Sequence, residues 1–223
     1  MSNVMRILLF LSVLIYTFNF SFGQELKLKY ELSMSSDDPE MQTQLQMSEG
    51  SSLTIYAQNE KSRVEMNMGA LMKTTTILDM EKGQGLMLME GMFGKQAAKF
   101  EGEDFTEYSE QDEEIELELL DETKEILGYQ CKKAIYYSEE DDVEMTFWYT
   151  EEIELSEAYL MDNSKYGIPG IALEYFFEQP EATMTFKAVE IETELQEENL
   201  FELNIPEGYS EKSFRDITNM SGQ

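Results

Sequence analysis

The sequence predicts a mainly β protein with a few helices. Its curved antiparallel sheet should form an incomplete barrel, covered by one or more short helices. Two observations carry this prediction. Apolar and polar residues alternate with a period of two in one stretch after another, and turn-forming residues separate these stretches at short intervals. Roughly ten or more short strands at such spacing are typical of an antiparallel sheet that curls on itself.

The first half of the chain shows this alternation clearly. In residues 26–34 every second side chain is apolar, from Leu26 to Met34, and the side chains between them are polar. Asn59-Glu60 separates two further runs of the same kind and predicts a hairpin turn. The strands predicted here after the first cover residues 53–57, 64–68, 74–80, 85–90 and 96–100.

The second half continues the pattern. Residues 167–170, Gly-Ile-Pro-Gly, predict a sharp turn that leads into a strand with an aromatic face. In the following strand the apolar phase slips between Ala188 and Val189, which predicts a β-bulge. The predicted strands are 115–119, 131–137, 143–149, 171–177, 184–191 and 200–205.

Helix signals are few. The sequence Asp37-Asp38-Pro39-Glu40 is typical of a helix start, and Met41, Leu45 and Ser48 would then share one face. A second short helix is predicted around residues 155–161. The acidic stretch 101–114 is the longest polar interruption and is predicted to be a surface loop.

The N-terminus resembles a secretory signal peptide over residues 1–23. Arg6 precedes an apolar run, and Ser21-Phe22-Gly23 supplies small residues before the predicted cleavage point. An uncleaved anchor is the alternative, but the run is interrupted by polar residues and is shorter than the ~20 residues that span a bilayer. We therefore expect a periplasmic or secreted protein that is not a lipoprotein. It would have no transmembrane segment, a single half-barrel domain over residues 24–215, and a flexible tail over residues 216–223.

The charge balance excludes some partners. The chain has 46 acidic and 16 basic residues, a formal net charge of −30. Phosphate backbones would be repelled, which excludes nucleic acid as a partner, and anionic membrane surfaces would be repelled for the same reason. A saline habitat would explain the acidity equally well.

The absence of histidine removes the usual catalytic triads, imidazole metal sites and the common general base. The single Cys131 cannot form an internal disulfide and is best explained as a small buried residue. Alternating glutamates such as those at 114, 116 and 118 are typical of a solvated strand face. The carboxylate clusters lack the spacing of an EF-hand. We therefore expect no enzymatic activity, no cofactor and no bound metal.

Methionine is unusually abundant, with 16 residues in the chain, many of them between Met66 and Met92. Three interpretations stay open: an ordinary core, an adaptable apolar pocket, and thioether capture of Cu(I). The run Leu86-Met87-Leu88-Met89 is apolar on both faces, so either a helix or a guest molecule must cover it.

Several segments resemble known families. Residues 167–172 are similar to the signature of a family of secreted bacterial proteins named for a Gly-Leu-Pro-Gly-Leu-Ile motif, with isoleucine at 168 and 171 and alanine at 172. Residues 122–134, 148–153 and 200–209 resemble segments of a related domain family of unknown function.

This resemblance implies a fold like that of the LolA/LolB lipoprotein carriers, an incomplete barrel with an apolar interior. Relatives with that fold bind acyl chains or lipids. Such carriers hold a functional arginine in the cavity, and here Arg63 is the only plausible equivalent. The resemblance thus implies a non-enzymatic protein whose partner is a lipid or lipoprotein. Alternatives are a structural or interaction module of the cell envelope with a closed core and, third, a Cu(I)-binding protein. The residues expected to line the cavity are Met66, Met68, Leu86, Leu88, Phe147, Tyr175 and Phe177.

Overall fold

The computed structural model describes residues 25–92, 94–109, 117–138, 143–153, 167–178 and 182–221. Twelve strands form one sheet in the order β12-β6-β5-β4-β3-β2-β1-β11-β10-β9-β8-β7. All neighbours are antiparallel except the short β12, which runs parallel to β6. The strands are β1 (Glu25–Ser35), β2 (Ser52–Gln58), β3 (Lys61–Asn67), β4 (Met72–Asp79), β5 (Gln84–Gly91), β6 (Gly94–Glu101), β7 (Glu118–Ile126), β8 (Tyr129–Ser138), β9 (Val143–Thr150), β10 (Ile171–Glu178), β11 (Thr183–Glu192) and β12 (Ser210–Glu211).

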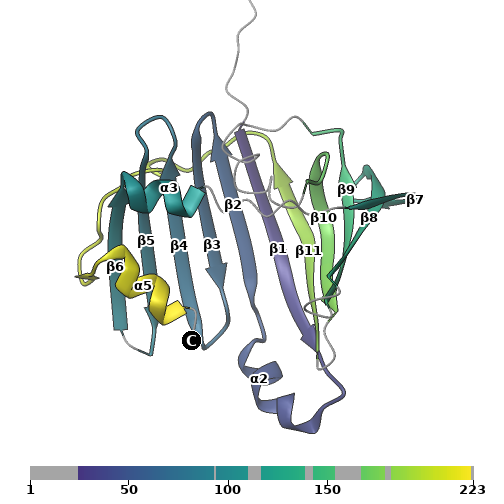
Figure 1. Cartoon of the computed structure of the whole chain (residues 1–223). Helices are drawn as coiled ribbons and strands as arrows, with labels where there is room; N and C mark the ends of the chain where they lie inside the picture. Colours follow the sequence, from purple (N-terminus) through teal and green to yellow (C-terminus); the bar gives the residue numbers. More distant parts are fainter. Residues whose placement is uncertain are drawn as a thin grey trace, which may run out of the picture.

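The sheet is curved and open, as Figure 1 shows, with β7 and β12 as its two edges. The predicted fold class, a mainly β protein with an unclosed curved sheet and few helices, is therefore confirmed. The helical elements among the described residues are η2 (Pro39–Met41), α2 (Gln42–Met47), α3 (Glu103–Ser109) and α5 (Phe214–Ser221). Figure 1 places α3 and α5 in front of the β4–β6 end of the sheet. We call the face that carries them the inner face.

The bulge predicted from the slip in apolar phase is confirmed. Lys29 of β1 pairs with Glu190 of β11, whereas Tyr30 pairs with Ala188, so Val189 is the extra residue. A second bulge lies in β10 at Leu173, between the pairs that Ala172 and Glu174 make with β9. An extra residue in one strand increases the local twist, and both bulges lie where the sheet curves between β1 and β9.

The helix predicted after residue 38 is also confirmed. The Met41 amide donates a 3.1 Å hydrogen bond to the Asp38 carbonyl, which starts the turn of η2. Met41, Leu45 and Ser48 are half-buried as expected for one shared face, whereas Gln46 and Met47 are exposed. The helix predicted around residues 155–161 lies outside the described residues.

Two predictions for the polar middle of the chain are wrong in extent. The acidic stretch 101–114 is not a continuous loop, because residues 103–109 form α3. Acidic residues at a helix start interact favourably with its dipole, and Phe105 and Tyr108, three residues apart, pack against the sheet. The strand predicted over residues 115–119 begins only at Glu118 within the described residues and continues to Ile126.

The predictions for the C-terminal region are corrected more strongly. Residues 200–205 are not a strand. Their apolar side chains instead cover the face opposite to the inner face, which we call the outer face. Phe201, Leu203 and Ile205 pack there with Tyr209, over a buried cluster of Ile77, Leu86, Leu88 and Ala97. Residues 216–221, assigned to a flexible tail, belong to α5, and Ile217 is fully buried.

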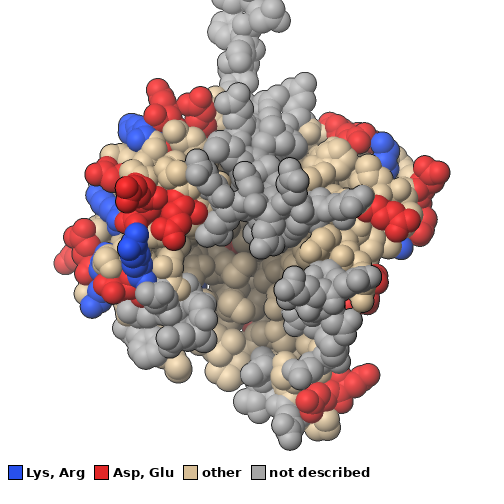
Figure 2. Space-filling view, viewed as in Figure 1, with Lys and Arg blue, Asp and Glu red and all other residues tan. Residues whose placement is uncertain are grey.

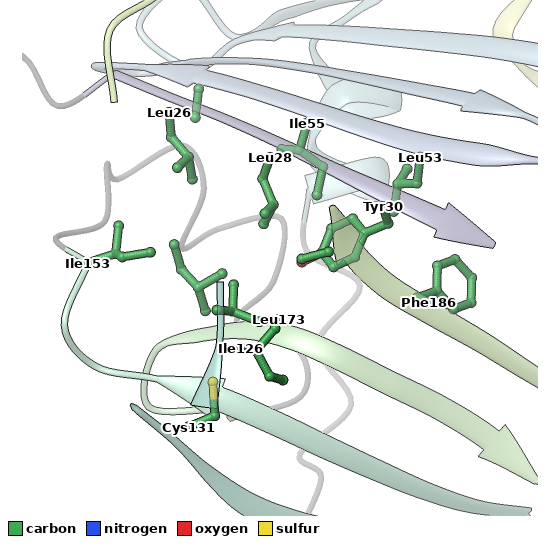
Figure 3. Close-up of a cluster of buried hydrophobic side chains, with 13 residues drawn as sticks. Leu26, Leu28, Tyr30, Leu53, Ile55, Ile126, Cys131, Ile153, Leu173 and Phe186 are labelled. Carbon is green, nitrogen blue, oxygen red and sulfur yellow. The ribbon is translucent and has the colours of Figure 1, made fainter. Parts of the chain in front are cut away.

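The main core lies between β1 and β2 on one side and the end of β7, β8, β10 and the turn after β9 on the other. Figure 3 shows Leu26, Leu28 and Ile55 pointing toward Ile126, Ile153 and Leu173, which come from the opposite layer. The residues of this cluster are almost entirely shielded from solvent. No helix within the described ranges has the length and apolar character needed to cross a bilayer.

Candidate ligand-binding face

The inner face is built from cross-strand rows of uncharged side chains. Successive side chains of a strand point to opposite faces, so the strand register identifies the residues that share the inner face. Two rows cross β1 to β6, and two shorter rows cross β1, β11, β10, β9 and β8. The rows are Leu28-Ile55-Val64-Thr76-Met87-Ala98, Tyr30-Leu53-Met66-Thr74-Met89-Gln96, Leu32-Phe186-Tyr175-Phe147-Ala134 and Met34-Met184-Phe177-Met145-Tyr136.

Tyr175 lies at the centre of an aromatic group on this face. Its ring stacks on Phe186 with centroids 4.5 Å apart and an interplanar angle of 8°. Phe147 and Phe177 lie 6.0 and 5.9 Å away, and Tyr30 contacts it edge-on at 5.5 Å. Such offset and edge-to-face pairs fix the rings relative to one another. The group therefore forms a rigid apolar floor.

Part of this floor remains accessible. Six of its side chains are only half-buried. They are Val64, Met66 and Met87 on one side and Tyr175, Phe177 and Met184 on the other. Figure 2 shows a hollow in the middle of this face in which the visible described side chains are uncharged. Methionine and aromatic side chains are typical of surfaces that accept varied apolar guests.

The structure brings together four of the seven residues predicted to line the cavity. Phe147, Tyr175 and Phe177 belong to the aromatic group, and Met66 packs against the same core. Met68 is half-buried just beyond the end of β3, where its amide donates a 2.8 Å hydrogen bond to the Met72 carbonyl.

The placement of Leu86 and Leu88 in the lining is wrong. Both point to the outer face, where the chain's own residues 201–209 cover them, and Leu86 is fully buried. Alternation could not decide the orientation, because β5 is apolar on both faces. The cover on the outer side comes from a segment more than a hundred positions later in the sequence. Met87 points to the inner side, where it packs against the cluster that includes Phe100 and α5.

Sequence reasoning also missed Leu32, Met184 and Phe186. The alternation in residues 184–191 indicated Met184 and Phe186, because both precede the phase slip and lie on the apolar side of the strand. Their proximity to Tyr175 follows only from the pairing of β10 with β11.

In β1 to β6 and in β11, the charged side chains lie on the outer face. Lys27 bridges Glu190 and Glu192 there at 2.7 and 3.1 Å. The hydrogen bond that Lys27 donates to Glu190 is the largest cause that raises the pKa of Lys27, and the same bond lowers the pKa of Glu190. Both groups therefore stay ionised at neutral pH. Glu197, 3.8 Å from the same Lys27 ammonium, attaches the start of the 193–209 segment to the sheet.

Arg63 also lies on the outer face. Its Nε donates a 2.7 Å hydrogen bond to Glu65, and its guanidinium donates a second one, at 3.0 Å, to the Leu200 carbonyl. The arginine that the carrier resemblance would place in the cavity therefore anchors the covering segment.

Two kinds of reactive group can be placed among the described residues, the Cys131 thiol and the carboxylates. Burial raises the pKa of the Cys131 thiol to about 11, so the thiol is protonated and weakly nucleophilic at neutral pH. Within the described ranges, no three His, Cys, Asp or Glu side chains lie close enough to hold a metal ion. A pocket of about 250 Å³ lies away from the aromatic group, at the ends of β5 and β6, and is lined by Gln84, Gly85, Lys99, Phe100, Glu101 and Leu203.

The methionines near α5 form part of a packed cluster. Met72, Met80, Met87 and Met89 surround Phe100 and the α5 residues Phe214 and Ile217. This arrangement is what an ordinary core requires, and thioether capture of Cu(I) stays a prediction.

Comparison with known proteins gives a partial match. The family described as "N-glycanase peptide, N-terminal domain" matches residues 91–200, slightly less than half of the chain. No curated protein matches. Two solved structures of PNGF-II are similar: one in space group C2, with 13% identity and a TM-score of 0.47 over 90% of this chain, and one in P21, with 14% identity and 0.48 over 88%. The chain spans about a third of the length of each (33%).

Proposed function

We propose that the protein binds an apolar ligand, an acyl chain or another lipid or lipoprotein tail, in the hollow of its inner face, without catalysing a reaction. The observation that carries this proposal is the continuous uncharged floor around Tyr175, which stays half-exposed at Phe177, Met184 and Met66. The signal-like residues 1–23 support a site of action in the periplasm or outside the cell.

The physical basis is the removal of hydrocarbon from water. Each methylene buried contributes ~0.8 kcal/mol, so a chain of about a dozen gains enough to offset the cost of ordering it. A floor whose rings are fixed by mutual contacts requires little reorganisation when a guest binds. The hollow thus has the chemistry of an acyl-chain site.

The test is displacement of the neutral fluorophore N-phenylnaphthylamine by octyl, decyl and dodecyl maltoside, all below their micellar concentrations. Affinity should rise by up to about fourfold for each added methylene, the factor that ~0.8 kcal/mol corresponds to. Absence of fluorophore uptake by the native protein, or competition that is independent of chain length, would contradict the proposal.

Two neighbouring residues of β11 provide a matched pair of variants. Met184→Gln places an amide on the half-exposed inner face, and Thr185→Gln makes the same change on the outer face, where Thr185 is also half-buried. The first variant should weaken dodecyl maltoside binding by at least about fivefold, because an amide buried against a hydrocarbon chain lacks a hydrogen-bond partner. The second should bind within about twofold of wild type.

The second candidate is an interaction module of the cell envelope whose interior is packed shut. The buried cluster around Leu28 and Leu173 favours it, because these side chains are almost entirely shielded from solvent. Failure of both fluorophore and maltosides to bind, with Met184→Gln less stable than wild type, would select this candidate.

A further inference from the structure

The charged side chains of β1 to β6 point away from the inner face. In β1 to β6 the acidic strand residues, such as Glu31, Glu65 and Glu90, alternate with the inner-face rows and point outward. None of the four rows contains a charged residue. In β8, Lys132 lies on the inner side one pair beyond the rows, and it is bound to Glu151 at 2.9 Å. A ligand in the hollow therefore meets uncharged side chains along its chain, and a charged head group must lie at the edge.

That edge is acidic. Helix α3, which packs on the inner face, carries Glu103, Asp104 and Glu107. Arg215 of α5 approaches two of them, at 3.6 and 4.0 Å, and leaves the group with a net negative charge. At the α2 end, Asp37, Asp38 and Glu49 are exposed. Figure 2 shows acidic side chains on the left, right and lower borders of this face, around the uncharged hollow, with basic side chains among them on the left and right.

We propose that the ligand is a long-chain amphiphile with a positively charged head group. This inference rests on the proposed function and specifies its ligand. An anionic head group at this edge would be repelled by the surrounding carboxylates and by a chain of net charge −30, whereas a cationic one would be attracted. The carboxylates are solvent-exposed, and the Debye length is about 8 Å at physiological ionic strength. The preference should therefore be moderate and sensitive to salt.

The test uses three amphiphiles with the same chain: dodecyltrimethylammonium, dodecyl maltoside and dodecanoate. Each displaces N-phenylnaphthylamine below its micellar concentration. At low ionic strength the cation should bind at least about fivefold tighter than the maltoside, and dodecanoate at least about fivefold weaker. At ~1 M salt, where the Debye length is about 3 Å, the three should agree within about twofold. Tetramethylammonium, the head group alone, should not displace the fluorophore.

Two double variants locate the effect. Glu103→Gln with Glu107→Gln removes two charges from α3 on the inner face. Glu207→Gln with Glu211→Gln removes two exposed charges from the outer-face segment and β12. The first should reduce the preference for the cation at least twofold, and the second should leave it unchanged, although both change the net charge equally.

The outcomes separate this inference from the proposed function. If the maltoside binds with chain-length dependence but the three head groups bind equally, or dodecanoate binds most tightly, the head-group proposal fails and the proposed function stands. Equal loss of preference in both double variants would also overturn it, because overall charge would then be the cause. If no amphiphile binds, both proposals fail.

Discussion

The Tyr30 hydroxyl donates a 2.6 Å hydrogen bond to the backbone carbonyl of Ala172, next to the bulge in β10. Tyr30 belongs to β1 and its exposed fraction is only 2%. Its ring also contacts Tyr175. This one side chain therefore connects the centre of the sheet, the bulge of β10 and the floor of the hollow.

Tyr30→Phe should lower the free energy of unfolding by about 1–2 kcal/mol, because a buried hydrogen bond is removed while the ring is kept. Urea denaturation measures this change. Tyr137→Phe, at a residue that is 54% exposed, serves as the control and should change stability by less than about 0.5 kcal/mol. Equal stability of the two variants would show that the bond to Ala172 contributes nothing.

Gly170→Ala should destabilise the fold by about 1–3 kcal/mol, the usual cost of forcing extra atoms into a packed site. A Cβ at Gly170 would overlap the carbonyl of Thr150, which is backbone and cannot rotate away. Gly91→Ala is the matched control, because its Cβ would meet the nearest atom, the Leu71 carbonyl oxygen, only at 3.4 Å. Thermal unfolding followed by circular dichroism should show a large decrease in Tm for the first variant only.

Asp79 should make the protein acid-labile. The exposed fraction of Asp79 is 1%, and it accepts hydrogen bonds from the Lys82 side chain at 2.6 Å and the Lys82 amide at 3.2 Å. Burial alone would raise the pKa of the Asp79 carboxyl, but the bonds from Lys82 outweigh it and hold the pKa below its usual 3.8.

Because the folded-state pKa is lowered, the stabilisation from Asp79 is fully present above the unfolded value near 4. It is lost as the pH falls through the folded value. Asp79→Asn should cost about 1–3 kcal/mol at pH 7 and should flatten the decline in stability on the acid side. Unfolding free energies of both proteins across the acid range measure this. Parallel pH profiles for wild type and variant would contradict the assignment.

Ile217→Ala should lower the free energy of unfolding by about 2–4 kcal/mol, the usual cost of a cavity in a packed core. Ile217 is fully buried against Phe100 and Phe214, whose rings lie 4.4 Å apart. Arg215→Ala in the same helix removes a side chain that is 72% exposed and should cost less than about 0.5 kcal/mol. Similar small effects of both would mean that α5 contributes little to the fold.

Sequence reasoning was most successful where one local pattern decides the structure. The phase slip at Val189 is such a case, because a bulge is the only way to keep both halves of β11 facing the core. The helix start at Asp37-Asp38-Pro39 is another, since caps and proline act within a single turn. The alternation around Tyr175 and Phe177 identified the aromatic side of β10 for the same reason.

The errors arose where a segment that is distant in the sequence determines which face a residue points to or whether a strand forms. Leu86 and Met87 are equally apolar, and only the position of residues 201–209 determines which of them faces the chain's own cover. Residues 200–205 have the alternation of a strand, but they lie across the outer face and do not pair with the sheet. The α5 residues Phe214 and Ile217 carry too short a pattern to indicate a helix until the cluster that receives them is known.

Strand β1 lies between β2 and β11, and its Lys27 bonds to Glu190, 163 positions away. Strands β2 to β6 each pair with the next strand in the sequence, so their antiparallel pairs can form early during folding. The other side of β1 has to wait for a loop of that length to close, which is entropically costly and slow. When the chain is synthesised or exported N-terminus first, the edge of β1 that pairs with β11 stays unpaired, with its apolar side chains exposed, until β11 has emerged. The late pairing of β1 with β11 should therefore govern both the folding rate and the tendency to aggregate during folding.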